Sequence, residues 1–189
     1  REMELLLESN SFFVDDDRMA FGFRGCQIAD DSDGISSANE VRLRRVRPDH
    51  MSFNCVLGVY DRRSERVSVF AGSTVPQVAY MWRTVRGEAA SNLMPTGMYK
   101  YIRGPHRPGR YTEQKNCLRL VGIWDGSTRA QTSRIFVLRT IDDLEFDPTS
   151  ANEIWDRTTP YNNIHSAVFS DDPRLNMSRD GVLYSSAGC

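Results

Sequence analysis

The chain has 189 residues, a length that suits one domain with a hydrophobic core of its own. Its net charge is −1, from 24 basic and 25 acidic residues, which argues against a nucleic-acid binder. Apolar residues make up 40% of the chain but form only short runs, so no segment is predicted to span a membrane. The composition therefore predicts one globular domain over residues 1–189.

The first fifty residues hold two short apolar runs, 3–8 and 19–24, and both are predicted as strands. Residues 30–39 are acidic and rich in Gly and Ser, which is typical of an exposed loop. This stretch and the Asp15-Asp16-Asp17 run both lack the ligand spacing of a calcium loop. Residues 1–50 are interpreted as an N-terminal elaboration whose role the sequence does not indicate.

A period of two in residues 53–59 and 67–71, with a polar connection between them, predicts a β-hairpin. Further strands are predicted at residues 41–46, 98–102, 117–124, 134–140, 164–169 and 182–184. Residues 75–85 fit a short helix or a strand, and residues 152–157 one helical turn. Gly, Pro and Arg in residues 103–115 indicate a long loop. The pattern predicts a mostly β fold, a sandwich or barrel with one or two short helices.

The four cysteines, at positions 26, 55, 117 and 189, have spacings that match no zinc or Cys-x-x-Cys motif. Cys55 and Cys117 lie inside apolar runs and are predicted to be buried, inert thiols. The three histidines are far apart in the sequence, so neither a metal nor another cofactor is predicted. Cys26 follows a glycine, but it lacks a nearby serine and a histidine upstream, which makes it a weak candidate nucleophile.

Two motifs near the end of the chain carry the functional interpretation. They are Asn163-Ile164-His165-Ser166 and Ser185-Ser186-Ala187-Gly188-Cys189. Upstream stand an apolar hairpin ending in Val67-Ser68-Val69-Phe70-Ala71-Gly72 and the turn Met94-Pro95-Thr96-Gly97-Met98-Tyr99. These four motifs, in this order, resemble the L,D-transpeptidase family over residues 52–189. The resemblance implies an L,D-transpeptidase-like β-sandwich with a cysteine nucleophile.

In that family the cysteine and the histidine form the catalytic pair, which here implies Cys189 as nucleophile and His165 as base. An imidazole can accept the thiol proton and form a thiolate–imidazolium pair. The resemblance also implies that Ser166 orients the histidine ring through its backbone carbonyl. Gly188 allows the backbone to approach a substrate, and its N–H can act with that of Cys189 as an oxyanion hole. Ser186 can hydrogen-bond within the turn and hold its shape.

The chain departs from the family pattern in three places. Ala187 stands where the family has a second histidine. His165 and Cys189 are 24 residues apart, a longer loop than is usual in the family. No arginine follows the cysteine. A terminal carboxylate next to the Cys189 thiol would raise its pKa and disfavour the thiolate. We therefore expect the functional protein to continue past Cys189.

Three residues are predicted to contact substrate. Arg103 and His106 lie in the Gly/Pro-rich stretch and would bind a substrate carboxylate, since arginine binds carboxylates bidentately. The alternative for both is an exposed basic loop. Tyr99 is interpreted as an aromatic of the core or of the wall of a substrate groove.

Together these observations predict a cysteine-dependent acyltransferase or peptidase that acts on peptidoglycan stem peptides through a thioester acyl-enzyme. The expected location is the periplasm, the cell envelope or an exported fraction. One alternative is a wall-degrading toxin or phage-type enzyme on the same fold, delivered as part of a larger chain or assembly. Another is a module that binds the cell wall, or assembles on it, without turnover.

Overall fold

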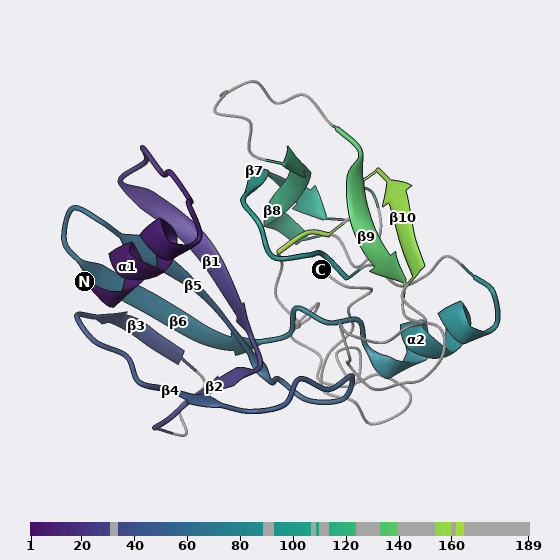
Figure 1. Cartoon of the computed structure of the whole chain (residues 1–189), viewed down its shortest axis with the longest axis horizontal. Coiled ribbons are helices and arrows are strands. Elements are labelled where there is room, and N and C mark those ends of the chain that lie inside the picture. The colour runs from purple at the N-terminus through teal and green to yellow at the C-terminus, as the bar shows by residue number, and fades with distance from the viewer. Residues whose placement is uncertain are drawn as a thin grey trace.

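The computed structural model describes residues 1–30, 34–88, 93–106, 109, 114–123, 133–139, 154–159 and 162–164. Within these residues the chain forms two short helices and ten strands, and every strand pairing is antiparallel (Figure 1). The helices are α1 (Glu2–Ser9) and α2 (Val78–Val85). The strands are β1 (Arg18–Arg24), β2 (Cys26–Ile28), β3 (Gly34–Ala38), β4 (Leu43–Arg45), β5 (Cys55–Asp61), β6 (Arg66–Gly72), β7 (Tyr99–His106), β8 (Gln114–Ile123), β9 (Ile135–Arg139) and β10 (Ile154–Thr158). The prediction of a mostly β protein with one or two short helices is therefore confirmed.

The largest sheet has the strand order β1-β5-β6-β3. The predicted hairpin is present as β5–β6, in register from the Cys55–Gly72 pair to the Asp61–Arg66 pair. Strand β1 pairs with β5 along its whole length, and β3 pairs with the other edge of β6. Residues 1–50 thus supply two of the four strands and are an integral part of the sheet that contains the hairpin.

One face of this sheet is buried under the segment that follows β1. Phe21, Val56 and Val69 from three adjacent strands pack with Ile28 of β2. Gly58 lies between Phe21 and Val69 in the register, and a Cβ atom at this position would overlap the Phe21 ring. A side chain at Gly58 would therefore push Phe21 out of the core, which explains the glycine in a strand interior.

Strand β2 pairs with β4, and strands β7 to β10 form a separate group, which Figure 1 shows beside the large sheet. β7 pairs with β8, and β9 pairs with β10. Leu120 of β8 packs with Ile135 and Val137 of β9, and Tyr99 and Tyr101 lie against them. The large sheet and this group therefore have hydrophobic clusters of their own. No helix in the described part of the chain is long and apolar enough to cross a membrane.

Two predicted elements have the wrong type. Residues 3–8 were expected to form a strand but lie in α1, whose leucines and glutamates favour a helix and whose first turn carries Glu2 and Glu4. Residues 152–157 were expected to form a helical turn, but Ile154–Thr158 is strand β10. The segment is extended because it pairs with β9. A salt bridge of 3.1 Å between Arg139 and Asp156 also joins the two strands.

Two predicted loops are also partly wrong. Within residues 30–39, Gly34–Ala38 forms strand β3, because the edge of β6 offers backbone partners that no local pattern reveals. Within residues 103–115, β7 extends to His106 and β8 begins at Gln114, so the connection is shorter than expected. The ambiguous segment at residues 75–85 contains α2. Of the strand predicted at 164–169, the structure describes only residue 164, which forms an isolated bridge, and the strand predicted at 182–184 lies outside the described residues.

Helix α1 buries one residue, Leu7, so it has no large apolar face against the sheet. An ion pair holds it there instead. The Arg62 guanidinium donates to both carboxylate oxygens of Glu4, at 3.0 Å each, and also to the carbonyl of Val14. Hydrogen bonding from Arg62 holds the pKa of Glu4 below its ordinary value. The helix is thus attached through a carboxylate that must be ionised.

We expect Glu4→Gln to lower the stability at neutral pH by about 0.5 kcal/mol, the scale of a partly exposed ion pair. Because the folded-state pKa of Glu4 is lowered, the ionised pair stabilises the protein above the unfolded pKa and loses this effect as pH falls through the folded pKa. Urea denaturation should therefore show the two proteins converging in stability below about pH 4. Glu8→Gln, on the exposed side of α1, is the control. A difference that stays constant down to acid pH would contradict the prediction.

The half-buried side chain of Arg24 joins the large sheet to the segment that leads into β7. Its Nε donates to the Thr74 hydroxyl at 3.0 Å, and its Nη2 donates to the carbonyls of Thr74 and Met94 at 3.2 and 3.1 Å. The Thr74 hydroxyl in turn donates to the Cys55 sulfur at 3.2 Å. Burial lowers the pKa of Arg24, so these hydrogen bonds offset a real cost of desolvation.

Arg24→Ala should lower the free energy of unfolding by about 2 kcal/mol, because it leaves backbone carbonyls without their donor. Arg24→Lys should recover only part of this, since an ammonium group lacks the planar fork that reaches several acceptors. The exposed Arg45→Ala is the matched control and should change stability by less than about 0.5 kcal/mol. Equal effects of Arg24→Ala and Arg45→Ala in chemical denaturation would show that the Arg24 hydrogen bonds are not stabilising.

Candidate functional site

The predicted catalytic residues Cys189, His165, Gly188, Ser166 and Ser186 lie outside the described residues. The structure describes the three predicted substrate contacts, Tyr99, Arg103 and His106, and it also describes residues 162–164, directly before His165. The candidate site is therefore built from the β7–β8 hairpin and from the segment that precedes the proposed base.

Residues 162–164 are attached to β8 by backbone hydrogen bonds. The N–H of Leu118 donates to the carbonyl of Ile164 at 3.0 Å, and the N–H of Ile164 donates to the carbonyl of Leu118 at 2.8 Å. This reciprocal pair forms an antiparallel bridge between segments 46 residues apart in the sequence. The chain is thus anchored on a strand at the position before His165.

A side-chain contact reinforces this attachment. Asn163 accepts a hydrogen bond from the backbone N–H of Leu120 at 3.3 Å through Oδ1. Its amide nitrogen Nδ2 lies 3.0 Å from Nδ1 of His106. Asn163 therefore contacts both strands of the hairpin, and His106 is placed beside the segment that leads to His165.

Arg103 lies on an exposed part of β7, three residues before His106. Its Nη2 donates to Oδ1 of Asn116 on β8 at 2.8 Å. An amide is a neutral partner, so the guanidinium keeps its charge uncompensated in this contact. Arg103 can therefore still attract a carboxylate.

Tyr99 lies at the other end of β7 from His106. Its ring packs against the cluster of Leu120, Ile135 and Val137, and its hydroxyl donates to the carbonyl of Pro95 at 2.7 Å. Burial raises the pKa of Tyr99 to about 12, and nearby Arg24 offsets part of this shift. Seven residues of extended chain separate Tyr99 from His106 by about 23 Å. A small ligand cannot contact both, whereas an extended polymer can.

Asn163 lies within one of the two motifs near the end of the chain, but the motif predicts no role for it. No local signal could have revealed it, because its partner His106 is 57 residues away in the sequence. The site that the structure assembles is therefore His106 and Asn163 with Arg103 nearby, next to the anchored Ile164. Among the described residues no group of His, Cys, Asp and Glu could hold a metal ion.

A surface hollow of about 490 Å³ is lined by Asp16, Asp17, Arg18, Asp61 and Arg63. Four of these five charges form two ion pairs, with 2.8 Å between Arg18 and Asp61 and 2.6 Å between Arg63 and Asp17. The hydrogen bond from Arg18 lowers the pKa of Asp61 to about 2. These ion pairs account for four of the five lining residues without a ligand.

The three described cysteines are free thiols with different environments. Cys55 and Cys117 are 1% and 2% exposed, as predicted for buried thiols. Cys26 is half-buried and donates to the carbonyl of Phe23 at 3.4 Å. Burial, with a contribution from Cys55, raises the pKa of Cys26, which makes it a poor nucleophile.

Iodoacetamide should therefore modify Cys26 slowly in the native protein and should leave Cys55 and Cys117 unmodified until the chain unfolds. Peptide mapping by mass spectrometry, with and without denaturant, measures this order. Denatured protein is the control, because its thiols should all react at ordinary rates. Rapid native labelling of Cys55 or Cys117 would contradict the burial described above.

Comparison of the chain with protein-family models, with curated proteins and with solved structures found no match.

Proposed function

We propose that the protein is a cysteine-dependent acyltransferase or peptidase that acts on peptidoglycan stem peptides. In this proposal Cys189 is the nucleophile, His165 is the base, and the fold is an L,D-transpeptidase-like β-sandwich. The four motifs that suggest this family occur in the expected order over residues 52–189. The first of them forms the β5–β6 hairpin, and the turn at residues 94–98 directly precedes β7.

The observation that carries the proposal is the antiparallel bridge between Leu118 and Ile164. A general base must be held in a defined position relative to the nucleophile. The two backbone hydrogen bonds of the bridge anchor the residue immediately before His165 on β8. The bridge also brings this segment to β8, the strand that pairs with β7, which carries Arg103 and His106.

The shape and charge of the β7–β8 hairpin support a peptide substrate. The predicted contacts extend along one strand, which suits an extended chain rather than a compact molecule. Arg103 and His106 lie toward one end of this strand, and both can donate to carboxylates. Stem peptides carry free carboxylates and have the extended form that this arrangement requires.

The proposed reaction has two steps. His165 takes the proton from Cys189, and the thiolate attacks the carbonyl carbon of an L,D peptide bond while the backbone N–H groups of Gly188 and Cys189 stabilise the oxyanion. The C–N bond breaks, His165 gives the proton to the leaving amine, and a thioester remains. An amine acceptor then yields a cross-link, and water yields cleavage; in both cases the Cys189 thiol is regenerated.

The site of action in this proposal is the cell wall, reached by a periplasmic, envelope-bound or exported protein. A toxin or phage-type enzyme delivered in a larger assembly would use the same residues on the same substrate. A wall-binding module without turnover would keep the hairpin but would not need a reactive thiol at position 189. Thiol reactivity therefore separates the enzyme from the binding module.

The test is alkylation of the native protein by iodoacetamide at about pH 6 and about pH 8.5, followed by peptide mapping. An ordinary thiol is about a hundredfold less ionised at the lower pH. We expect Cys189 to react at nearly equal rates at both pH values, because His165 stabilises its thiolate. His165→Ala should restore the hundredfold dependence. Cys26 in the same digests is the internal control and should show a pH dependence at least as steep as that of an ordinary thiol, because its pKa is raised.

Incubation of the protein with purified sacculi then shows which reaction it catalyses. New cross-links or released peptides that disappear in Cys189→Ser would support the enzyme and identify the acceptor as amine or water. A steep pH dependence of Cys189 in the wild-type protein would contradict the proposed catalytic pair. Reactive Cys189 with no change in the sacculi would contradict peptidoglycan as the substrate.

A further inference from the structure

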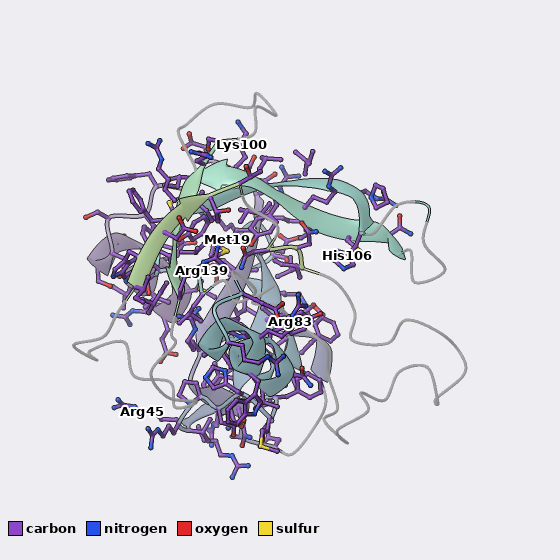
Figure 2. All side chains as sticks on the ribbon, turned by 90° about the vertical axis from the view of Figure 1, so that its right-hand side faces the viewer. Met19, Arg45, Arg83, Lys100, His106 and Arg139 are labelled. Carbon is purple, nitrogen blue, oxygen red and sulfur yellow. The ribbon has the colours of Figure 1, made fainter. Side chains whose placement is uncertain are left out.

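We propose that Asn163 is a positioning residue that holds His106 as a neutral Nε2–H donor, and that protonation of His106 releases the segment leading into His165. The first half of this inference follows from hydrogen-bond chemistry alone. The second half rests on the proposed function only for the role of His165. Figure 2 shows His106 at the end of the β7–β8 hairpin, well away from Lys100 at the other end.

The orientation of the Asn163 amide is determined by the backbone. The N–H of Leu120 points at one end of this amide, 3.3 Å from it, and only the carbonyl oxygen can accept that hydrogen bond. A rotated amide would place its NH₂ group against another N–H donor. The NH₂ group must therefore face His106, where the two nitrogens are 3.0 Å apart.

This orientation determines the tautomer of the imidazole. An NH₂ group can only donate, so Nδ1 of His106 must accept and cannot carry a proton. The ring is then neutral, with its proton on Nε2. In this form Nε2 of His106 is an N–H donor.

Protonation of His106 would break this arrangement. The imidazolium has N–H groups at both nitrogens, so Nδ1–H would face the NH₂ group of Asn163 with no acceptor between them. The charged side chains described on this part of the hairpin are Arg103 on β7 and Arg119 on β8, which packs over Gly104, and residues 162–164 carry no charge. The neutral form is therefore favoured, and acid is needed to separate Asn163 from the ring.

Loss of the Asn163–His106 hydrogen bond would affect the segment that directly precedes His165. Asn163 lies between the buried Asn162 and Ile164, whose bridge to Leu118 anchors the segment. Loss of the Asn163–His106 hydrogen bond removes one of the contacts that hold this segment on the hairpin. We therefore expect the bridge to open more readily as pH falls through the pKa of His106.

The first experiment measures the tautomer and pKa of His106 by imidazole ¹⁵N NMR, with His106→Gln to assign the signal. We expect the Nε2–H tautomer and a pKa below the ordinary value of about 6.5. Asn163→Asp should raise the pKa by about one unit, a tenfold gain in proton affinity, because a carboxylate accepts from Nδ1–H. It should also move the proton of the neutral ring to Nδ1. Asn116→Ala, on the same hairpin, is the matched control and should leave the tautomer unchanged.

The second experiment follows amide hydrogen exchange at Leu118, Leu120 and Ile164 against pH, corrected for intrinsic rates. Protection should fall as His106 becomes protonated in the wild-type protein. In His106→Gln, where the amide oxygen can still accept from Asn163 but cannot titrate, protection should not depend on pH. The Nδ1–H tautomer in the wild-type protein, or an unchanged pKa in Asn163→Asp, would overturn the proposed hydrogen bond. Amide protection in the wild-type protein that does not change with pH would overturn the coupling between His106 protonation and the bridge.

These readouts do not require activity, so they separate this inference from the proposed function. A steep pH dependence of Cys189 alkylation would overturn the catalytic pair and leave the His106–Asn163 contact intact. The Nδ1–H tautomer of His106, found together with alkylation of Cys189 that does not depend on pH, would leave the catalytic pair intact and rule out Asn163 as a positioning residue.

Discussion

The half-buried guanidinium of Arg24 is the interaction on which the arrangement of the molecule depends. The large sheet and the β7–β10 group have apolar clusters of their own, and a third cluster packs Val75 against Leu93 and Leu138. Arg24 bonds Thr74, which directly precedes Val75, and Met94, which packs against the Leu120 cluster. A guanidinium suits this place because its planar donors reach several acceptors at once. A hydrophobic residue could fill the volume, but the backbone carbonyls at the junction would then lack donors.

This junction also links the two parts of the resemblance. The hairpin that resembles the first motif lies in the large sheet, and the turn that resembles the second leads into β7. Arg24 comes from the first fifty residues, which lie outside the resemblance. The N-terminal region therefore contributes to the placement of the candidate site, although no residue in it is assigned a chemical role.

At the other end of the β7–β8 hairpin, a single amide performs a similar joining role. Asn163 contacts Leu120 and His106 and thereby ties the segment before His165 to both strands. The two junctions differ in their sensitivity to pH. A guanidinium keeps its charge throughout the physiological range, whereas an imidazole can gain a proton when the pH falls. The inferred pH response is therefore confined to the segment that leads into the proposed base.

Where local pattern and pairing agree, the elements follow from the sequence. The β5–β6 hairpin, β1, β7, β8 and β9 show alternating or apolar runs with polar boundaries, and all are confirmed. The wrong predictions concern short segments whose conformation depends on distant partners. β3 and β10 are strands because β6 and β9 pair with them, and α1 is held on the sheet by Arg62.

The sequence by itself determined the mostly β class, the central hairpin, the burial of Cys55 and Cys117, and the choice of Cys189 and His165 as candidates. These depend on periodicity, apolar runs and motif order, which are properties of neighbouring residues. Only the tertiary structure decided that Arg24 joins the two groups of strands, that residues 1–50 complete the large sheet, and that Asn163 orients His106. Each of these depends on a hydrogen bond between residues tens of positions apart, and no local pattern specifies which distant donor will meet which acceptor.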